Sequence, residues 1–246
     1  MTKKTRLTKA IVLSAGLGLR LRPITETLPK PLVKVGGRTL LDRALDRLEA
    51  ANVTSAIVNL HHLGPLIERH LCKRASPEIS FSFEETLLET GGGVLNALGR
   101  LGPGPFFAVN ADTLWLNGSV DALKRMTDAW DDTRMDALLL LHSTVDAYGY
   151  EGVGDFTMDP VGRLVRRSED EVSPYLFTGV QILHPRLFAG EKNGAFSLNR
   201  LYDKAIKAGR LYGLVHDGEW FHVGTPGGLA QAEAYMSVHY PGIKHR

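Results

Sequence analysis

The chain has 246 residues, of which 43% are hydrophobic and 23% are charged, a composition typical of globular proteins. This length predicts one large α/β domain, residues 1–246, with a sizeable buried core. The formal net charge of +2 gives no argument for nucleic-acid or membrane partners. A single cysteine excludes an intrachain disulfide, and the apolar runs are too short for a membrane span or a signal peptide. We therefore expect a cytoplasmic protein.

Strand and helix patterns alternate along the first 141 residues. Short apolar runs predict strands at 10–13, 55–60, 79–84, 106–109 and 137–141. Apolar residues at helical spacing predict helices at 39–51, 65–74, 92–101 and 120–129. This alternation is typical of βαβ units, so we expect a Rossmann-like, mostly parallel sheet flanked by helices.

The pattern changes between residues 148 and 184, where glycine and proline interrupt short alternating stretches at 155–158, 163–167 and 176–183. These stretches predict a small mixed β region laid over the carboxyl end of the first sheet. The α/β pattern returns at 198–208, 211–215 and 228–239. Ligands of open α/β sheets bind beyond the carboxyl ends of the strands, so we expect the site there.

The loop after the first strand has the residues that a triphosphate requires. Gly16 and Gly18 lack Cβ atoms, so backbone N–H groups can approach phosphate oxygens closely. Arg20 offers forked donors, and Lys30, between two prolines, offers a point charge. We expect the prolines of this loop to hold it in an extended shape. A dinucleotide fingerprint would need glycine at position 21, where Leu21 stands, and no P-loop triplet occurs.

The order of these residues resembles the signature of the sugar-1-phosphate nucleotidylyltransferases. Nine positions match it in order: Gly16, Gly18, Arg20, Pro23, Thr25, Pro29, Lys30, Pro31 and Leu32. The resemblance implies a glycosyltransferase-A-like fold and a reaction between a nucleoside triphosphate and a sugar 1-phosphate that releases pyrophosphate. It also implies catalytic roles for Arg20 and Lys30, and nucleotide contacts from Ala15, Gly16 and Gly18. The competing interpretation is a glycine- and proline-rich surface loop with solvated charges.

Asp112 follows the fourth predicted strand and the dipeptide Asn110-Ala111. A carboxylate at a strand's carboxyl end, beside a triphosphate loop, is well placed to hold Mg²⁺ together with phosphate oxygens and water. We therefore expect Mg²⁺ as the cofactor and Asp112 as a catalytic residue, although an Asp at such a position also commonly caps a turn.

Polar and glycine residues at two other strand ends are candidates for nucleotide binding. Glu89, Thr90, Gly91 and Gly92 precede a predicted helix, whose N-terminal amides are a ready site for acceptor atoms. The resemblance implies that this stretch recognises the base, whereas the alternative is that its glycines only permit close packing. Asn59 ends the second predicted strand, so it is expected to contact base, ribose or sugar.

The sugar is expected to bind between two further elements. Thr178 and Gly179 resemble the family's element beneath the sugar, where glycine lets a ring approach the backbone. Gly149 is expected on the opposite side, and Asn110 completes the predicted sugar-binding set within the sub-region 148–184 and its neighbours.

His222 lies in the stretch Trp220–Thr225, which resembles a late family element whose aspartate is the second metal ligand. Neutral imidazole is a poor ligand for Mg²⁺. An indirect role at a phosphate or at metal-bound water and a structural, partly buried histidine remain open.

The resemblance favours UTP and N-acetylmuramate 1-phosphate as substrates, with a place in peptidoglycan recycling. Mannose- or heptose-1-phosphate guanylyl transfer is an alternative, as is a catalytically silent, nucleotide-sugar-binding regulator of the same fold. No protein nucleophile is evident, which is consistent with direct displacement by the sugar phosphate. We expect a monomer or a small homo-oligomer.

Overall fold

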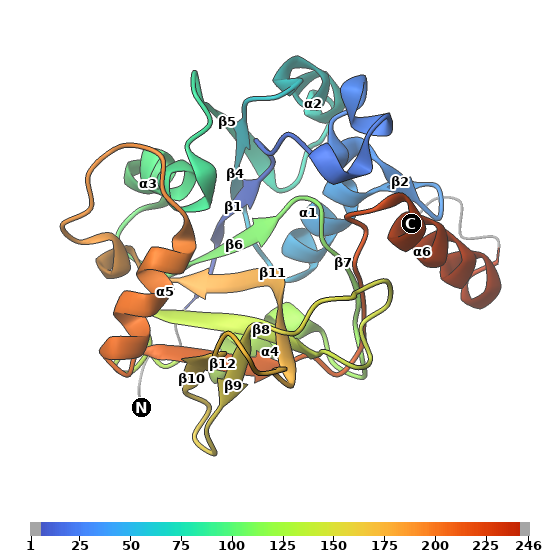
Figure 1. Ribbon diagram of the computed structural model, residues 1–246. Coiled ribbons are helices and arrows are strands. Elements are labelled where there is room, and N and C mark those ends of the chain that lie inside the picture. Colours follow the sequence, from blue (N-terminus) through green and yellow to red (C-terminus); the bar gives the residue numbers. More distant parts are fainter. Residues whose placement is uncertain (1–5, 242–246) are drawn as a thin grey trace.

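A twisted sheet of nine strands forms the centre of the structure, a computed structural model that describes residues 6–241 (Figure 1). Its main path runs in the order β12-β8-β11-β6-β1-β4-β5, and the β9-β10 hairpin is attached to β11. The strands are β1 (Lys9–Leu13), β4 (Ser55–Leu60), β5 (Glu78–Phe83), β6 (Phe106–Asn110), β8 (Ala137–Ser143), β9 (Phe156–Met158), β10 (Leu164–Arg166), β11 (Tyr175–Leu183) and β12 (Leu211–Val215).

Most of the long strands run in parallel. β1 pairs in parallel with β4 and β6, β4 with β5, and β8 with β12, whereas β11 runs antiparallel to both β6 and β8. The β9-β10 hairpin is antiparallel and meets β11 at the pair Tyr175 and Phe156. The predicted mostly parallel sheet with a small mixed β region is therefore confirmed.

Helices cover both faces of the sheet (Figure 1). α1 (Leu40–Ala50), α2 (Gly64–Leu71) and α4 (Ala122–Ala129) pack on one face, and α3 (Glu89–Leu101) and α5 (Leu198–Lys207) pack on the other. α6 (Pro226–His239) packs separately, against the short strands near it and the loop at residues 14–32, which we call the phosphate loop after its predicted role. No helix in residues 6–241 is both long and apolar enough to span a membrane.

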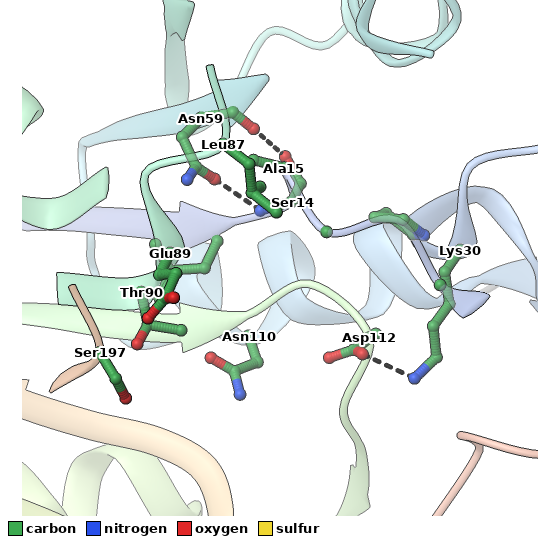
Figure 2. A pocket seen from close by; sticks show the side chains of 14 residues that line it. Ser14, Ala15, Lys30, Asn59, Leu87, Glu89, Thr90, Asn110, Asp112 and Ser197 are labelled. Carbon is green, nitrogen blue, oxygen red and sulfur yellow. Dashed lines mark hydrogen bonds and ion pairs between the residues drawn. The ribbon is translucent and has the colours of Figure 1, made fainter. Parts of the chain in front are cut away.

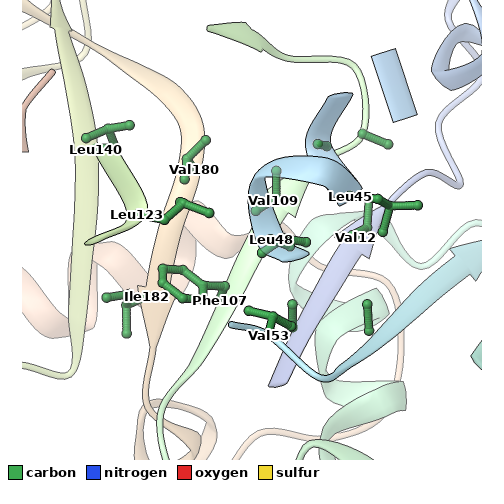
Figure 3. Close-up of a cluster of buried hydrophobic side chains, with 14 of the residues drawn as sticks. Val12, Leu45, Leu48, Val53, Phe107, Val109, Leu123, Leu140, Val180 and Ile182 are labelled. Carbon is green, nitrogen blue, oxygen red and sulfur yellow. The ribbon is translucent and has the colours of Figure 1, made fainter. Parts of the chain in front are cut away.

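Successive residues of the central strands supply the two cores. Ile11 and Val12 of β1 are both fully buried, but they point to opposite faces of the sheet. Figure 3 shows the core under α1, where Leu45 and Leu48 pack over Val12 and Phe107. Fully burying one such side chain contributes about 1.5–3 kcal/mol to the free energy of folding. The sheet is therefore held firmly in place beneath the strand ends that carry the site.

The predicted strands and helices of the first half all form, with ends that shift by up to three residues. The largest shifts are at α2, which ends at Leu71 rather than at residue 74, and at α3, which begins at Glu89 rather than at residue 92. Two short ribbons escaped prediction because their strands have only two or three residues: β2 (Lys34–Val35) with β3 (Arg38–Thr39), and β7 (Leu114–Leu116) with β13 (Glu219–Phe221).

The predicted extended shape of the phosphate loop is wrong. The loop folds into three short 3₁₀ turns, η1 (Leu19–Leu21), η2 (Ile24–Glu26) and η3 (Lys30–Leu32). The fixed φ of proline suits such turns as well as an extended chain, and Pro23 has helical angles, with φ −82° and ψ −8°. The Thr25 hydroxyl donates to the Gly18 carbonyl over 2.8 Å and ties the first two turns together.

Candidate active site

A cleft of about 400 Å³ opens at the carboxyl ends of β1, β4 and β6, where ligands were expected. Most of the predicted nucleotide and catalytic residues line it. The lining comprises Leu13, Ser14, Ala15, Gly16, Gly18, Lys30, Pro31, Asn59, Leu87, Glu89, Thr90, Asn110, Asp112 and Ser197.

The cleft has two ends of different character. Figure 2 shows Lys30 and Asp112 together at one end, and Glu89, Thr90 and Ser197 at the other. Asn110 lies between the two groups, beyond the end of β6. The charged end suits phosphates, and the opposite end is left for the base or the sugar.

The two glycines of the phosphate loop have separate functions. A Cβ atom added to Gly16 would meet nothing within 4 Å, so the backbone there is open to a ligand. Gly18 has φ +64°, and a Cβ on it would lie 2.9 Å from the Thr25 methyl carbon. Gly18 is therefore required for the turn itself, and Gly16 for access.

Lys30 and Asp112 form an ion pair across the charged end. Lys30 Nζ lies 2.6 Å from Asp112 Oδ2, and the two side chains are 11% and 39% exposed. The ammonium is thus held rigidly by a carboxylate that itself faces the cleft. A phosphate entering here would meet a positioned donor that needs little reorganisation.

Arg20 and His222 lie next to this pair. Burial lowers the pKa of His222 below its ordinary value, and the nearby charges of Arg20 and Lys30 lower it further, whereas Asp112 acts in the opposite direction. A Cβ on Gly224 would lie 2.5 Å from His222 Nε2 and 3.4 Å from an Arg20 nitrogen, so both side chains flank that glycine. His222 is therefore neutral near pH 7, and Arg20 is exposed beside it.

A buried polar network fixes the strand ends. The Asn59 Oδ1 accepts from the Ser14 backbone N–H over 2.6 Å, and Ser14 Oγ donates to the Asn59 carbonyl. Asn59 Nδ2 donates to Glu84 Oε1 over 2.7 Å, and Glu84 Oε2 accepts from the Leu88 N–H over 2.9 Å. Asn59 thus joins the phosphate loop to the start of α3. Sequence reasoning missed Glu84, whose only signal was a carboxylate at the end of a strand.

The glycines at the start of α3 lie behind the cleft rather than in its lining. The N–H groups of Gly91 and Gly92 both donate to the Phe196 carbonyl, over 2.8 and 3.1 Å. A Cβ on Gly91 would lie 2.4 Å from the Phe196 ring, and one on Gly92 would lie 2.2 Å from the Gly194 carbonyl oxygen. Close packing accounts for these glycines, and their amides are not free for a base. Only Glu89 and Thr90 of this stretch reach the cleft.

The predicted sugar-binding residues separate into two groups. Asn110 lines the cleft and rests on Gly179, where φ is +88° and a Cβ would lie 3.0 Å from Asn110 Nδ2. Thr178 faces the sheet instead, with Oγ1 donating to the Leu140 carbonyl over 2.8 Å. Gly149 packs against Gly228 of α6, where a Cβ would lie 2.9 Å from the Gly228 Cα, and lines a different hollow.

The indole of Trp220 connects its own segment to two others, the loop after β6 and β11. Trp220 Nε1 donates to Thr113 Oγ1 over 3.1 Å and to the Thr178 carbonyl over 3.0 Å. The stretch that ends in His222 is thereby fixed to the loop after β6 and to β11. The buried Trp220 side chain therefore holds these segments in place relative to Asp112.

A smaller cavity of about 200 Å³ adjoins the cleft and shares Thr90, Asn110 and Ser197 with it. We call it the side cavity. Its other lining residues come from β11 and α5: Phe177, Gln181, Leu198, Asn199 and Tyr202. Of the sub-region 148–184, only β11 thus borders the space for ligands, and the β9-β10 hairpin does not line either space.

The carboxylate of Asp112 suits a metal ion that enters the cleft already bound to the phosphates of a nucleotide. Among the described residues, no group of three or more His, Cys, Asp or Glu side chains could hold a metal ion. Asp112 faces the cleft beside the phosphate loop, and Mg²⁺ commonly uses one or two carboxylates with phosphate oxygens and water. The residues present therefore fit Mg²⁺ delivered as a nucleotide complex.

Comparisons with known proteins agree with this geometry. Residues 9–237 match the model of the family described as nucleotidyl transferase. The chain is 40% identical to the N-acetylmuramate alpha-1-phosphate uridylyltransferase of Caulobacter vibrioides over 93% of its own length and 96% of that protein. It is 27% identical to the mannose-1-phosphate guanylyltransferase of Mycobacterium tuberculosis, over 94% of this chain and 65% of that one.

Solved structures share the fold. A crystal structure of HddC from Yersinia pseudotuberculosis complexed with GMP-PN matches with a TM-score of 0.75 and 21% identity. The match covers 94% of this chain and all of that one.

Proposed function

Since the chain belongs to the nucleotidyl transferase family, we propose that it transfers the uridylyl group of UTP to N-acetylmuramate 1-phosphate and releases pyrophosphate. The observation that carries the proposal is the charged end of the cleft, where the glycine loop, Lys30 and Asp112 meet. The choice of base and sugar rests on the 40% identical uridylyltransferase, since the guanylyltransferase relative is more distant.

The reaction needs no nucleophile from the protein. An oxygen of the sugar phosphate attacks the α-phosphorus of UTP, a new P–O bond forms, and the bond to the β-phosphate oxygen breaks as pyrophosphate leaves. Catalysis then depends on alignment and on stabilising charge. The backbone around Gly16 holds the phosphates, and Lys30 and Arg20 donate to the oxygens that gain charge as the bond breaks.

We further propose that Mg²⁺ is the cofactor and that Asp112 is its protein ligand. When bound, the ion supplies positive charge that neutralises the phosphates and their leaving group. His222, neutral beside Arg20, would contact a phosphate or metal-bound water. The site therefore has one firm carboxylate, and we place the enzyme in the cytoplasm, where nucleoside triphosphates are available.

Pyrophosphate release from each of four nucleoside triphosphates, tested against several sugar 1-phosphates, distinguishes the alternatives. We expect the highest kcat/KM for UTP with N-acetylmuramate 1-phosphate. Turnover confined to GTP with mannose or heptose 1-phosphate would contradict the uridylyl assignment. Binding of nucleotide without turnover of any pair would instead indicate the silent regulator.

A further inference from the structure

Two arginine side chains meet at one tyrosine hydroxyl, on β12, at the edge of the sheet opposite β5 (Figure 1). Tyr212 is the second residue of β12, and it is only 3% exposed. Its hydroxyl oxygen accepts one hydrogen bond from Arg134 Nη2 over 3.2 Å and another from Arg163 Nε over 3.4 Å. Both arginines are exposed, so two positive charges converge on one point of the surface.

The backbone and the tyrosine ring hold these groups in place. Arg134 lies in the turn before β8, which pairs in parallel with β12. Arg163 comes directly before β10 and forms a β-bridge with Tyr212. The guanidinium carbon of Arg134 lies 5.2 Å from the centroid of the Tyr212 ring, a cation–π contact. These contacts reduce the freedom that the two guanidinium groups would lose on binding a ligand.

The two arginines differ from their neighbours in lacking a carboxylate partner. Arg186 and Arg210 both pair with Asp136, over 2.6 and 2.8 Å. Within residues 6–241, neither Arg134 nor Arg163 forms an ion pair. Two guanidinium groups that share a neutral oxygen repel each other, so an anion placed between them would stabilise both.

Acidic side chains act on this cluster only at longer range. Asp131 and Asp159 each accept a backbone N–H within their own turn and interact with one arginine through charge alone. Burial acts to raise the pKa of the Tyr212 hydroxyl, but the hydrogen bonds from Arg163 and Arg134 outweigh it and lower that pKa. An excess of positive charge therefore remains at the hydroxyl.

The unused donors define the chemistry of the ligand. The proton of the Tyr212 hydroxyl has no acceptor among the described residues, and each guanidinium uses one nitrogen at that oxygen. Three donor groups around one point match three oxygens of a tetrahedral phosphoryl group, and two positive charges match its two negative charges. A carboxylate has only two oxygens and one charge, so it would satisfy the cluster less completely.

We propose that Arg134, Arg163 and the Tyr212 hydroxyl bind a phosphoryl group, either as inorganic phosphate or as a phosphomonoester. β8 and β6 both run antiparallel to β11, so the amino end of β8 and the carboxyl end of β6 lie at opposite edges of the sheet. The site is therefore separate from the cleft, which opens at the carboxyl ends of β1, β4 and β6. The assignment does not depend on the proposed function.

Calorimetric titration with inorganic phosphate tests the site in the Lys30→Ala variant, where phosphate binding in the cleft is weakened. We expect Arg134→Gln or Arg163→Gln, added to this variant, to weaken phosphate binding by about tenfold or more, as loss of a charge-assisted hydrogen bond implies. Arg69→Gln, at an exposed arginine of α2, is the matched control and should leave the affinity unchanged.

NMR of the arginine side chains locates the bound phosphate and does not depend on the stability of any variant under titration. The Nε–H signals that disappear in Arg134→Gln and Arg163→Gln are assigned to these residues, and we expect both signals to shift when phosphate is added to the wild type. Signals that do not move, or an unchanged affinity in both folded variants, would overturn the site. Methyl phosphate distinguishes the sources: an affinity equal to that of inorganic phosphate would assign the site to phosphomonoesters, and a much weaker one to free phosphate.

Discussion

Lys30 and Asp112 form the ion pair on which the proposed phosphate site depends. Lys30 Nζ lies 2.6 Å from Asp112 Oδ2, and the Lys30 side chain is only 11% exposed. The ammonium would lose little freedom on contact with the phosphate that we propose binds there, which is the condition for effective charge stabilisation in a transition state.

Removing either cation should therefore affect the rate. We expect Lys30→Ala and Arg20→Ala each to lower kcat by about 10²–10³, the usual cost of one positioned donor. Steady-state pyrophosphate release measures the effect, and circular dichroism verifies that each variant is folded. Near-normal kcat in a folded variant would remove that residue from the mechanism.

The metal-binding role proposed for Asp112 leads to a prediction that can be tested without measuring turnover. With Asp112 as the one carboxylate proposed to hold the metal beside Lys30, the nucleotide-free protein should bind Mg²⁺ weakly, and UTP should bring most of the metal. Calorimetric titration with and without UTP measures this difference. His222→Asp should strengthen Mg²⁺ binding to the nucleotide-free protein, whereas tight binding by the wild type would reveal a second ligand.

The lowered pKa of His222 links stability to pH. Folding favours the neutral imidazole, so its contribution to stability is complete above the unfolded pKa of about 6.5 and falls as the pH drops below it. We expect the free energy of unfolding to fall less between pH 7 and 5.5 in His222→Asn than in the wild type. Urea titrations at the two pH values provide the measurement, and equal losses would show that His222 is not responsible.

Among the secondary-structure elements, α3 contains two glycines whose surroundings differ. Gly92 packs against the backbone of the 194–196 loop, whereas a Cβ on Gly99 of the same helix would meet nothing within 4 Å. The first glycine permits a contact between segments, and the second only adds flexibility to the helix.

Alanine at these two positions should have opposite effects. Gly92→Ala should lower the free energy of unfolding by about 2 kcal/mol, because the added methyl overlaps a carbonyl oxygen. Gly99→Ala should raise it by about 0.5–1 kcal/mol through helix propensity. Denaturant unfolding of both variants tests the packing interpretation, which would fail if Gly92→Ala were as stable as the wild type.

The same elements show what sequence reasoning could and could not predict. The strands that carry Asn110 and Asn59 were predicted because apolar runs reveal buried strands. The Phe196 carbonyl that occupies the amides of Gly91 and Gly92 was not, because its partner lies about a hundred residues away along the chain. The turns of the phosphate loop were missed for a local reason, since proline permits both extended and helical backbone.

For the whole molecule, the position of the site follows from topology. Four parallel strands, β1, β4, β5 and β6, end at one edge, and β11 crosses it in the opposite direction beside Asn110. This arrangement brings the proposed phosphate loop, a carboxylate and the strand proposed to face the sugar together from positions 16, 112 and 179. The side cavity could not be predicted, because Gln181 stands within an apolar strand pattern and only the packing of α5 shows that its Nε2 has no hydrogen-bond partner within residues 6–241.

The most direct test of the account is ³¹P NMR of UTP, N-acetylmuramate 1-phosphate and Mg²⁺ after addition of the protein. We predict that one pyrophosphate and one uridine diphosphate-linked sugar appear for each UTP consumed, and that Asp112→Ala forms neither. Conversion of UTP to UDP and phosphate, or UTP that stays intact with the folded wild type, would contradict direct uridylyl transfer at this cleft.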